Sequence, residues 1–121
     1  MKIPKFEAQT EWVKPTEFPD LRQADEIAID LETKDPGLKD RGSGSIIGEG
    51  EVVGISVATS FYKGYFPIAH EGGGNMDRIK VMYWLKDILE SSSTKIFHNA
   101  MYDVCWLRKL GFKINGDIVC T

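Results

Sequence analysis

The stretch EIAIDLE, residues 26–32, alternates between large aliphatic side chains and small or acidic ones. The aliphatic set consists of Ile27, Ile29 and Leu31. The other set includes the carboxylates of Asp30 and Glu32, and a period of two is typical of a strand. The stretch therefore predicts a central, well-buried strand that carries two neighbouring carboxylates on its second face.

This acidic pair has two explanations, which the strand alone leaves open. It is either a solvated strand face or a metal site, because two neighbouring carboxylates on a well-buried strand repel each other unless a cation lies between them. Oxygen ligands of this kind favour Mg²⁺ or Mn²⁺.

Hydrophobic periodicity and turn residues predict the elements that follow. The predicted strands cover 52–59, 63–69, 95–99 and part of 112–120, and the predicted helices cover 75–90 and 100–110. Asn75 is the expected N-cap of the first helix, and the glycine-rich segment 37–50 is expected to be a mobile loop. The order β-β-β-α-β-α-β predicts a mixed α/β layer whose helices cover the later strands.

The apolar residues of the first predicted helix are expected to lie in the core. They include Ile79, Met82, Trp84 and Leu89.

The segment HNAMYDVCWL, residues 98–107, forms a second polar constellation. Asn99 and Asp103 are four residues apart, which places an amide and a carboxylate on one helical face. Asn99 has a second explanation as a helix N-cap, and the two roles can coexist. His70 and His98 each follow a predicted strand, where a histidine is more often a hydrogen-bonded structural residue than a ligand.

The composition indicates one small domain. The chain has 121 residues, 15 Lys and Arg against 18 Asp and Glu, a net charge of −3 and 42% apolar residues. No apolar run approaches the roughly 20 residues that cross a bilayer, so membrane and secreted classes are not expected. Two cysteines, Cys105 and Cys120, fit a reducing compartment such as the cytoplasm. The mild acidity speaks against a stand-alone nucleic-acid binder that depends on a basic stripe.

The proline-rich beginning of the chain predicts an extended N-terminal arm over 1–23, ahead of a domain over 24–121. Trp12, Val13 and Phe18 are expected to hold this arm against the fold.

AIDLETKD at 28–35 followed by HNAMYDVCWL at 98–107 resembles the first two motifs of the 3′-to-5′ proofreading exonuclease domain of family A DNA polymerases, in the DEDD or DnaQ-like superfamily. VVGISVA and YFPIAH, which lie between them, are similar to the same family. The two motifs in this order are far more specific than either motif alone. The resemblance implies an α/β, ribonuclease H-like mixed sheet, with three antiparallel strands and then β-α-β-α-β.

The resemblance also implies a site and a reaction. Asp30, Glu32 and Asp103 match catalytic acids that bind metal, and Thr33, Asn99 and Tyr102 match positions that contact the terminal nucleotide. The implied reaction uses two divalent cations, Mg²⁺ or Mn²⁺, to hydrolyse the last phosphodiester at a single-stranded DNA 3′ end, which releases a nucleoside monophosphate. The implied partner is a polymerase domain, in the same full-length protein or as a split partner, in a bacterial or phage-infected cell.

The third motif of that family is a Tyr or His four residues before an Asp, which supplies the residue that orients the water and the last metal ligand. No such pattern follows Asp103. We therefore expect 24–121 to be a partial exonuclease domain, incomplete at its C-terminus, weak or inactive alone and prone to self-association through uncovered apolar surface.

Two alternatives keep the fold and change the function. One is a ribonuclease D-like or Werner-type exonuclease that acts on RNA or structured DNA. The other is a non-catalytic ribonuclease H-like module that binds a partner or a single-stranded end.

Overall fold

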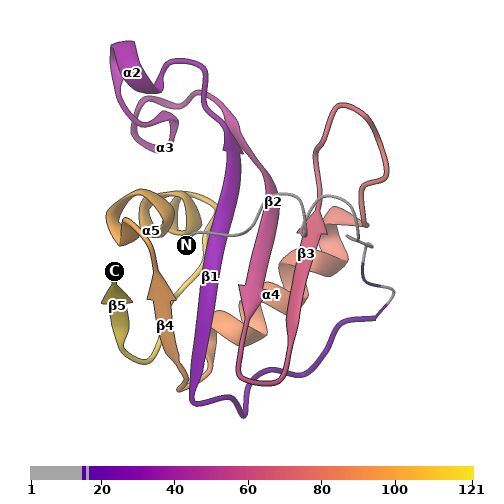
Figure 1. Cartoon of the computed structure of the whole chain (residues 1–121). Helices are drawn as coiled ribbons and strands as arrows, with labels where there is room; N and C mark the ends of the chain where they lie inside the picture. The colour runs from indigo at the N-terminus through magenta and orange to yellow at the C-terminus, as the bar shows by residue number, and fades with distance from the viewer. Residues whose placement is uncertain (1–14, 16) are drawn as a thin grey trace.

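A five-stranded mixed sheet organises the computed structural model, which describes residue 15 and residues 17–121 (Figure 1). The strands are β1 (Glu26–Lys34), β2 (Glu51–Ala58), β3 (Lys63–Pro67), β4 (Thr94–Phe97) and β5 (Ile118–Cys120), in the order β3-β2-β1-β4-β5. β2 is antiparallel to β1 and β3, whereas β4 is parallel to β1 and β5. The mixed α/β class and the antiparallel hairpin predicted from the sequence are confirmed.

Two longer helices pack with the sheet into one core. α4 (Arg78–Glu90) lies behind β2 and β3 in Figure 1, and α5 (Ala100–Lys109) follows β4 directly. The buried residues that β1 and these helices share in the core include Ile27, Ile29, Leu31, Val81, Leu85 and Leu107. In the part of the chain that the structure describes, no helix is both long and apolar enough to span a membrane.

β1 is the central strand, as its alternation predicts. Its aliphatic residues are buried, whereas Asp30 and Glu32 are exposed on the other face. The sheet therefore has one face that builds the core and one face on which β1 presents carboxylates.

The segment before β1 packs against the fold through Phe18, as expected. The Phe18 ring lies 6.0 Å from the ring of Phe66 and 5.8 Å from that of Trp84, centroid to centroid. The predicted contacts of Trp12 and Val13 lie outside the described residues.

The start of α4 differs from the prediction. The N-cap is Asp77, whose Oδ1 accepts hydrogen bonds from the N–H groups of Ile79 and Lys80 at 2.9 and 3.3 Å. Asn75 instead closes the preceding loop, because its side chain accepts from the His70 N–H at 2.7 Å and donates to the His70 carbonyl at 3.0 Å. Helix α4 therefore begins later than the sequence suggested.

The expected place of Ile79 in the core is wrong, since its side chain is 66% exposed. The buried face of α4 carries Val81, Leu85 and Ile88, and Ile79 lies about half a helical turn away from Val81.

The segment 37–50 contains two short helices, α2 (Leu38–Arg41) and α3 (Gly44–Ile47), where a loop without regular structure was expected. The Asp35 carboxylate accepts from the Gly44 N–H at 2.9 and 3.1 Å and anchors α3 to the end of β1. A Cβ at Gly44 would lie 2.0 Å from the Glu49 carbonyl oxygen. This glycine therefore permits close packing of the segment, which composition alone does not reveal.

The Asp77 cap gives a first test of the fold. Asp77→Ala should lower the free energy of unfolding by about 1 kcal/mol, because two N–H groups at the start of α4 lose their acceptor. Urea unfolding followed by circular dichroism measures the change. Asp87→Ala, at an exposed position inside the same helix, is the control and should stay within about 0.5 kcal/mol of the wild type. Equal stability of Asp77→Ala and Asp87→Ala would contradict the assigned cap.

Candidate active site

The candidate site lies at the edge of the sheet where β1 and β4 end. These strands are parallel, so their carboxyl ends meet at the same edge, and in open α/β sheets ligands bind outside this edge. Because α5 begins directly after β4, its first turn brings Asp103 back to β1.

Asp103 is buried, with only 3% of its surface exposed. Its Oδ2 accepts a hydrogen bond from the Leu31 N–H at 3.3 Å. β4 pairs with β1 only as far as Ala28, so Leu31 lies beyond the parallel ladder. Asp103 thus satisfies a backbone donor of β1 on the side where the neighbouring strand has ended.

The charges of Asp103 and Asp30 interact. The pKa of Asp103 rises from its ordinary value of 3.8 to about 7, chiefly because the carboxyl is buried; the nearby charge of Asp30 also raises it, and the Leu31 N–H lowers it. Asp30 and Asp103, two of the acids predicted as metal ligands, are therefore close enough for the charge of one to affect the pKa of the other. A cation between them would favour the ionised form of both.

Glu32 has other partners. Its Oε2 accepts a hydrogen bond of 2.6 Å from the Tyr65 hydroxyl, and the Tyr65 hydroxyl also bonds His70 Nε2. His70 is thus a hydrogen-bonded histidine, as expected. Tyr65 was missed by sequence reasoning, because only the strand register shows that it reaches β1.

The donor chemistry of these acids fits a divalent cation such as Mg²⁺ or Mn²⁺, which prefers oxygen ligands. The three acids do not converge, however: within residues 15 and 17–121, no group of three or more His, Cys, Asp or Glu side chains is placed to hold a metal ion. Asp103 is bonded to the N–H of Leu31, the residue after Asp30, whereas Glu32 is bonded to Tyr65. The role of all three as ligands stays a prediction.

Thr33 and Tyr102, which were expected to contact the substrate, lie together. The Tyr102 hydroxyl is 2.8 Å from Thr33 Oγ1 and donates to Asp35 Oδ2 at 2.7 Å. Burial is the main cause of a raised pKa of Tyr102. Since Asp35 also holds the Gly44 N–H, this cluster joins α5, the end of β1 and α3. Asp35 was not predicted, although it lies two residues beyond Thr33.

Asn99 does not share a helical face with Asp103. It precedes α5 in a left-handed conformation, with φ 54° and ψ 60°, and its side chain makes no capping hydrogen bond. Asparagine tolerates this conformation better than most residues. The Ala100 N–H donates instead to Cys120 Sγ at 3.2 Å. Asn99 therefore occupies the N-cap position without acting as a side-chain cap.

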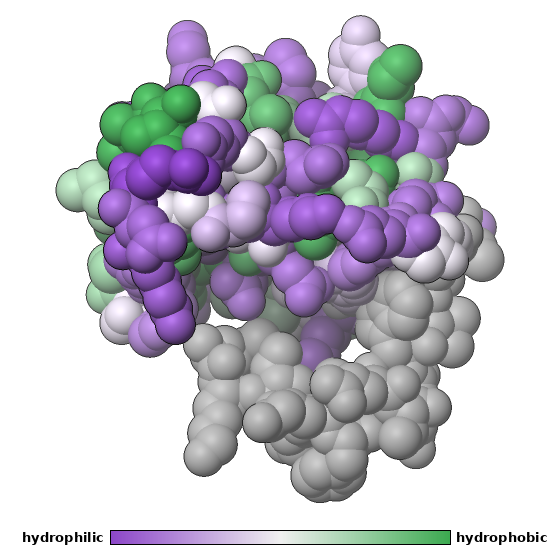
Figure 2. All heavy atoms as spheres, turned by 90° about the horizontal axis from the view of Figure 1, so that it is seen from above, coloured by the Kyte–Doolittle hydropathy of each residue, from purple (hydrophilic) through white to green (hydrophobic). Residues whose placement is uncertain are grey.

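The candidate acids differ in exposure, since Asp30 and Glu32 lie on the surface whereas Asp103 is buried. Figure 2 looks down on the end of the molecule where β1 finishes and shows mostly hydrophilic side chains, with separate apolar patches among them.

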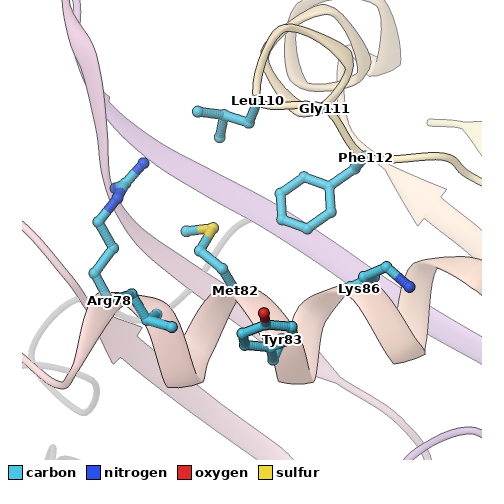
Figure 3. A pocket seen from close by; sticks show the side chains of 8 residues that line it. Arg78, Met82, Tyr83, Lys86, Leu110, Gly111 and Phe112 are labelled. Atoms are coloured by element: carbon cyan, nitrogen blue, oxygen red, sulfur yellow. The ribbon is translucent and has the colours of Figure 1, made fainter.

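A pocket of about 280 Å³ lies elsewhere, between α4 and the segment that follows α5 (Figure 3). The residues that line it are Arg78, Ile79, Met82, Tyr83, Lys86, Leu110, Gly111 and Phe112.

The raised pKa of Asp103 predicts how the metal-free protein responds to pH. Between 3.8 and about 7 the folded state holds a proton that the unfolded chain has released, so the free energy of unfolding should fall as pH rises through this window. The change should be at most a few kcal/mol, at about 1.4 kcal/mol per pKa unit. Urea unfolding in EDTA at several pH values measures it. Asp103→Asn should remove most of the slope, and an equally steep slope in that variant would contradict the assignment.

A curated relative matches part of the sequence. A DNA-directed DNA polymerase of Pseudomonas phage M6 is 38% identical over 81 residues, which is 64% of this chain and 12% of the phage protein. The chain thus spans about an eighth of the length of that relative. No family model matches the sequence.

Solved structures share the fold. The catalytic core of a RRP6 variant from Trypanosoma brucei has a TM-score of 0.54 and 23% identity, over 83% of this chain and 24% of that one. Brucella melitensis NrnC has a TM-score of 0.50 and 20% identity, over 84% of this chain and 43% of that one. NrnC with bound Mg²⁺ gives the same TM-score of 0.50 at 21% identity, with the same coverage. The chain therefore shares with these structures a mixed α/β, ribonuclease H-like fold.

Proposed function

We propose that this chain provides the proofreading 3′-to-5′ exonuclease fold of a DNA polymerase, which removes nucleoside monophosphates from a single-stranded DNA 3′ end. The observation that carries the proposal is the buried carboxylate of Asp103, held on the β1 backbone next to Asp30. The partial sequence match to a phage DNA polymerase supports the choice of DNA as substrate.

Asp30 and Asp103 would hold a divalent cation at the end of β1, and Glu32 would complete the set of acids. NrnC, a protein of similar fold, has been solved with Mg²⁺, which supports the use of such an ion. When bound, divalent cations stabilise the charge on the attacking and leaving oxygens of a phosphodiester. The fixed contact of Asp103 with Leu31 would keep its carboxylate in place without a change of rotamer.

Thr33, Tyr102 and Asn99 would position the terminal nucleotide. The mutual hydrogen bond between Thr33 and Tyr102 holds both hydroxyls at the same edge as the acids, and Asn99 is exposed where β4 passes into α5. Residues 104–121 contain neither tyrosine nor histidine, the residue types that would orient the water. We therefore propose weak activity for this polypeptide alone.

A linked polymerase domain would supply the affinity that this chain lacks. The net charge is −3, and a DNA strand is itself an anion. Tethering to a polymerase raises the effective concentration of the strand end and makes weak intrinsic binding sufficient.

Release of mononucleotides in Mn²⁺ tests the proposal. The wild type should degrade single-stranded DNA from the 3′ end slowly, and it should do so faster than RNA of the same sequence. Asp30→Ala should reduce the rate by at least about a hundredfold, since losing a metal ligand removes several kcal/mol of stabilisation, whereas the surface control Asp87→Ala should not change it. A wild-type rate no higher than that of Asp30→Ala would contradict the proposed exonuclease activity. A preference for RNA would contradict the polymerase role.

A further inference from the structure

The Glu32 carboxylate ends a chain of hydrogen bonds that starts on the loop after β3. The Tyr65 hydroxyl donates its one proton to Glu32 Oε2 at 2.6 Å. His70 Nε2 bonds the same hydroxyl oxygen, so His70 must be the donor in that contact. The order of donation is therefore His70 to Tyr65 to Glu32, and every proton in the chain points toward the carboxylate.

The sheet leaves room for this contact at a single glycine. Glu32 pairs with Gly54 of β2, and a Cβ on Gly54 would lie 1.8 Å from the Tyr65 hydroxyl oxygen. Tyr65 thus lies across β2 on the bare backbone of Gly54 to reach β1. The register between β1 and β2 also shifts between Glu32 and Thr33, and irregularities of this kind re-aim a side chain.

The His70 end of this chain of hydrogen bonds is held in place as well. Asn75 bonds both the N–H and the carbonyl of His70. Lys34, two residues after Glu32, forms an ion pair with Glu71. The loop after β3 is thus tied to the end of β1 beside the Glu32 contact.

This contact draws Glu32 toward β3, whereas Asp103 approaches β1 from α5, on the side of β4. Consistent with this divergence, the described residues contain no converged group of three acids. Glu32 can move more readily than Asp103, because 60% of its side chain is exposed whereas Asp103 is only 3% exposed.

We propose that Tyr65 and His70 are positioning residues that hold Glu32 apart from Asp30 and Asp103, and that Glu32 must give up the Tyr65 hydroxyl to join a bound cation. This inference rests on the proposed function, because it takes the three acids as ligands. Tyr65 thereby weakens the affinity of the site for a divalent cation and restricts full assembly of the acids to the loaded state.

Calorimetric titration with Mn²⁺ tests the sign of this effect. Tyr65→Phe keeps the ring and removes the hydroxyl, so it should bind Mn²⁺ about threefold to tenfold more tightly than the wild type, as expected for loss of one competing hydrogen bond of ordinary net strength. Gly54→Ala, which displaces the Tyr65 ring, should shift affinity in the same direction. Tyr62→Phe removes a hydroxyl from the turn of the same hairpin and should bind like the wild type.

Asp103→Asn distinguishes a failure of this inference from a failure of the proposed metal site. If Asp103→Asn loses Mn²⁺ binding but Tyr65→Phe binds equally or more weakly than the wild type, the proposed function stands and this inference is overturned. If Asp103→Asn binds as tightly as the wild type, the proposed metal site fails, and the inference fails with it. A double-mutant cycle of Tyr65→Phe and Glu32→Gln, measured by unfolding in EDTA, should show a stabilising coupling. Independence of the two substitutions would overturn the inference without any metal.

Discussion

The hydrogen bond from the Leu31 N–H to Asp103 is the contact on which the candidate site depends. β4 stops before it can pair with the last part of β1, and a buried backbone donor needs an acceptor. Helix α5 supplies that acceptor with a carboxylate. The same contact therefore completes the sheet edge and fixes one acid beside Asp30.

The hydrogen bond from Leu31 stabilises the fold, whereas the buried site disfavours ionisation of Asp103. Burial and the neighbouring charge of Asp30 disfavour the charged form of Asp103 and raise its pKa to about 7. A divalent cation would remove that penalty, so metal binding and the stability of this edge are linked. Glu32 is held away from Asp30 and Asp103 by its bond to Tyr65. The position of this third acid therefore depends on β3, which carries Tyr65, and on the loop that carries His70.

Local patterns were enough to predict the hairpin and β1, with Asp30 and Glu32 on its exposed face, because alternation depends only on nearby residues. Features that depend on register or on distant contacts were missed. The reach of Tyr65 to Glu32 requires Gly54 to lie opposite, and the anchoring role of Asp35 requires Gly44 to fold back onto it. The position of Asn99 was misjudged for a local reason. Its left-handed backbone places it outside α5, so the four-residue spacing to Asp103 is not a helical one.

Paramagnetic broadening by Mn²⁺ tests the central claim most directly. In a ¹H–¹⁵N spectrum of the wild type, substoichiometric Mn²⁺ should first broaden the amides of residues 29–33 and 100–104, because these flank Asp30 and Asp103. The same signals should persist in Asp103→Asn. Broadening that begins at another acidic part of the surface, such as residues 71–77, would contradict a metal site at the end of β1.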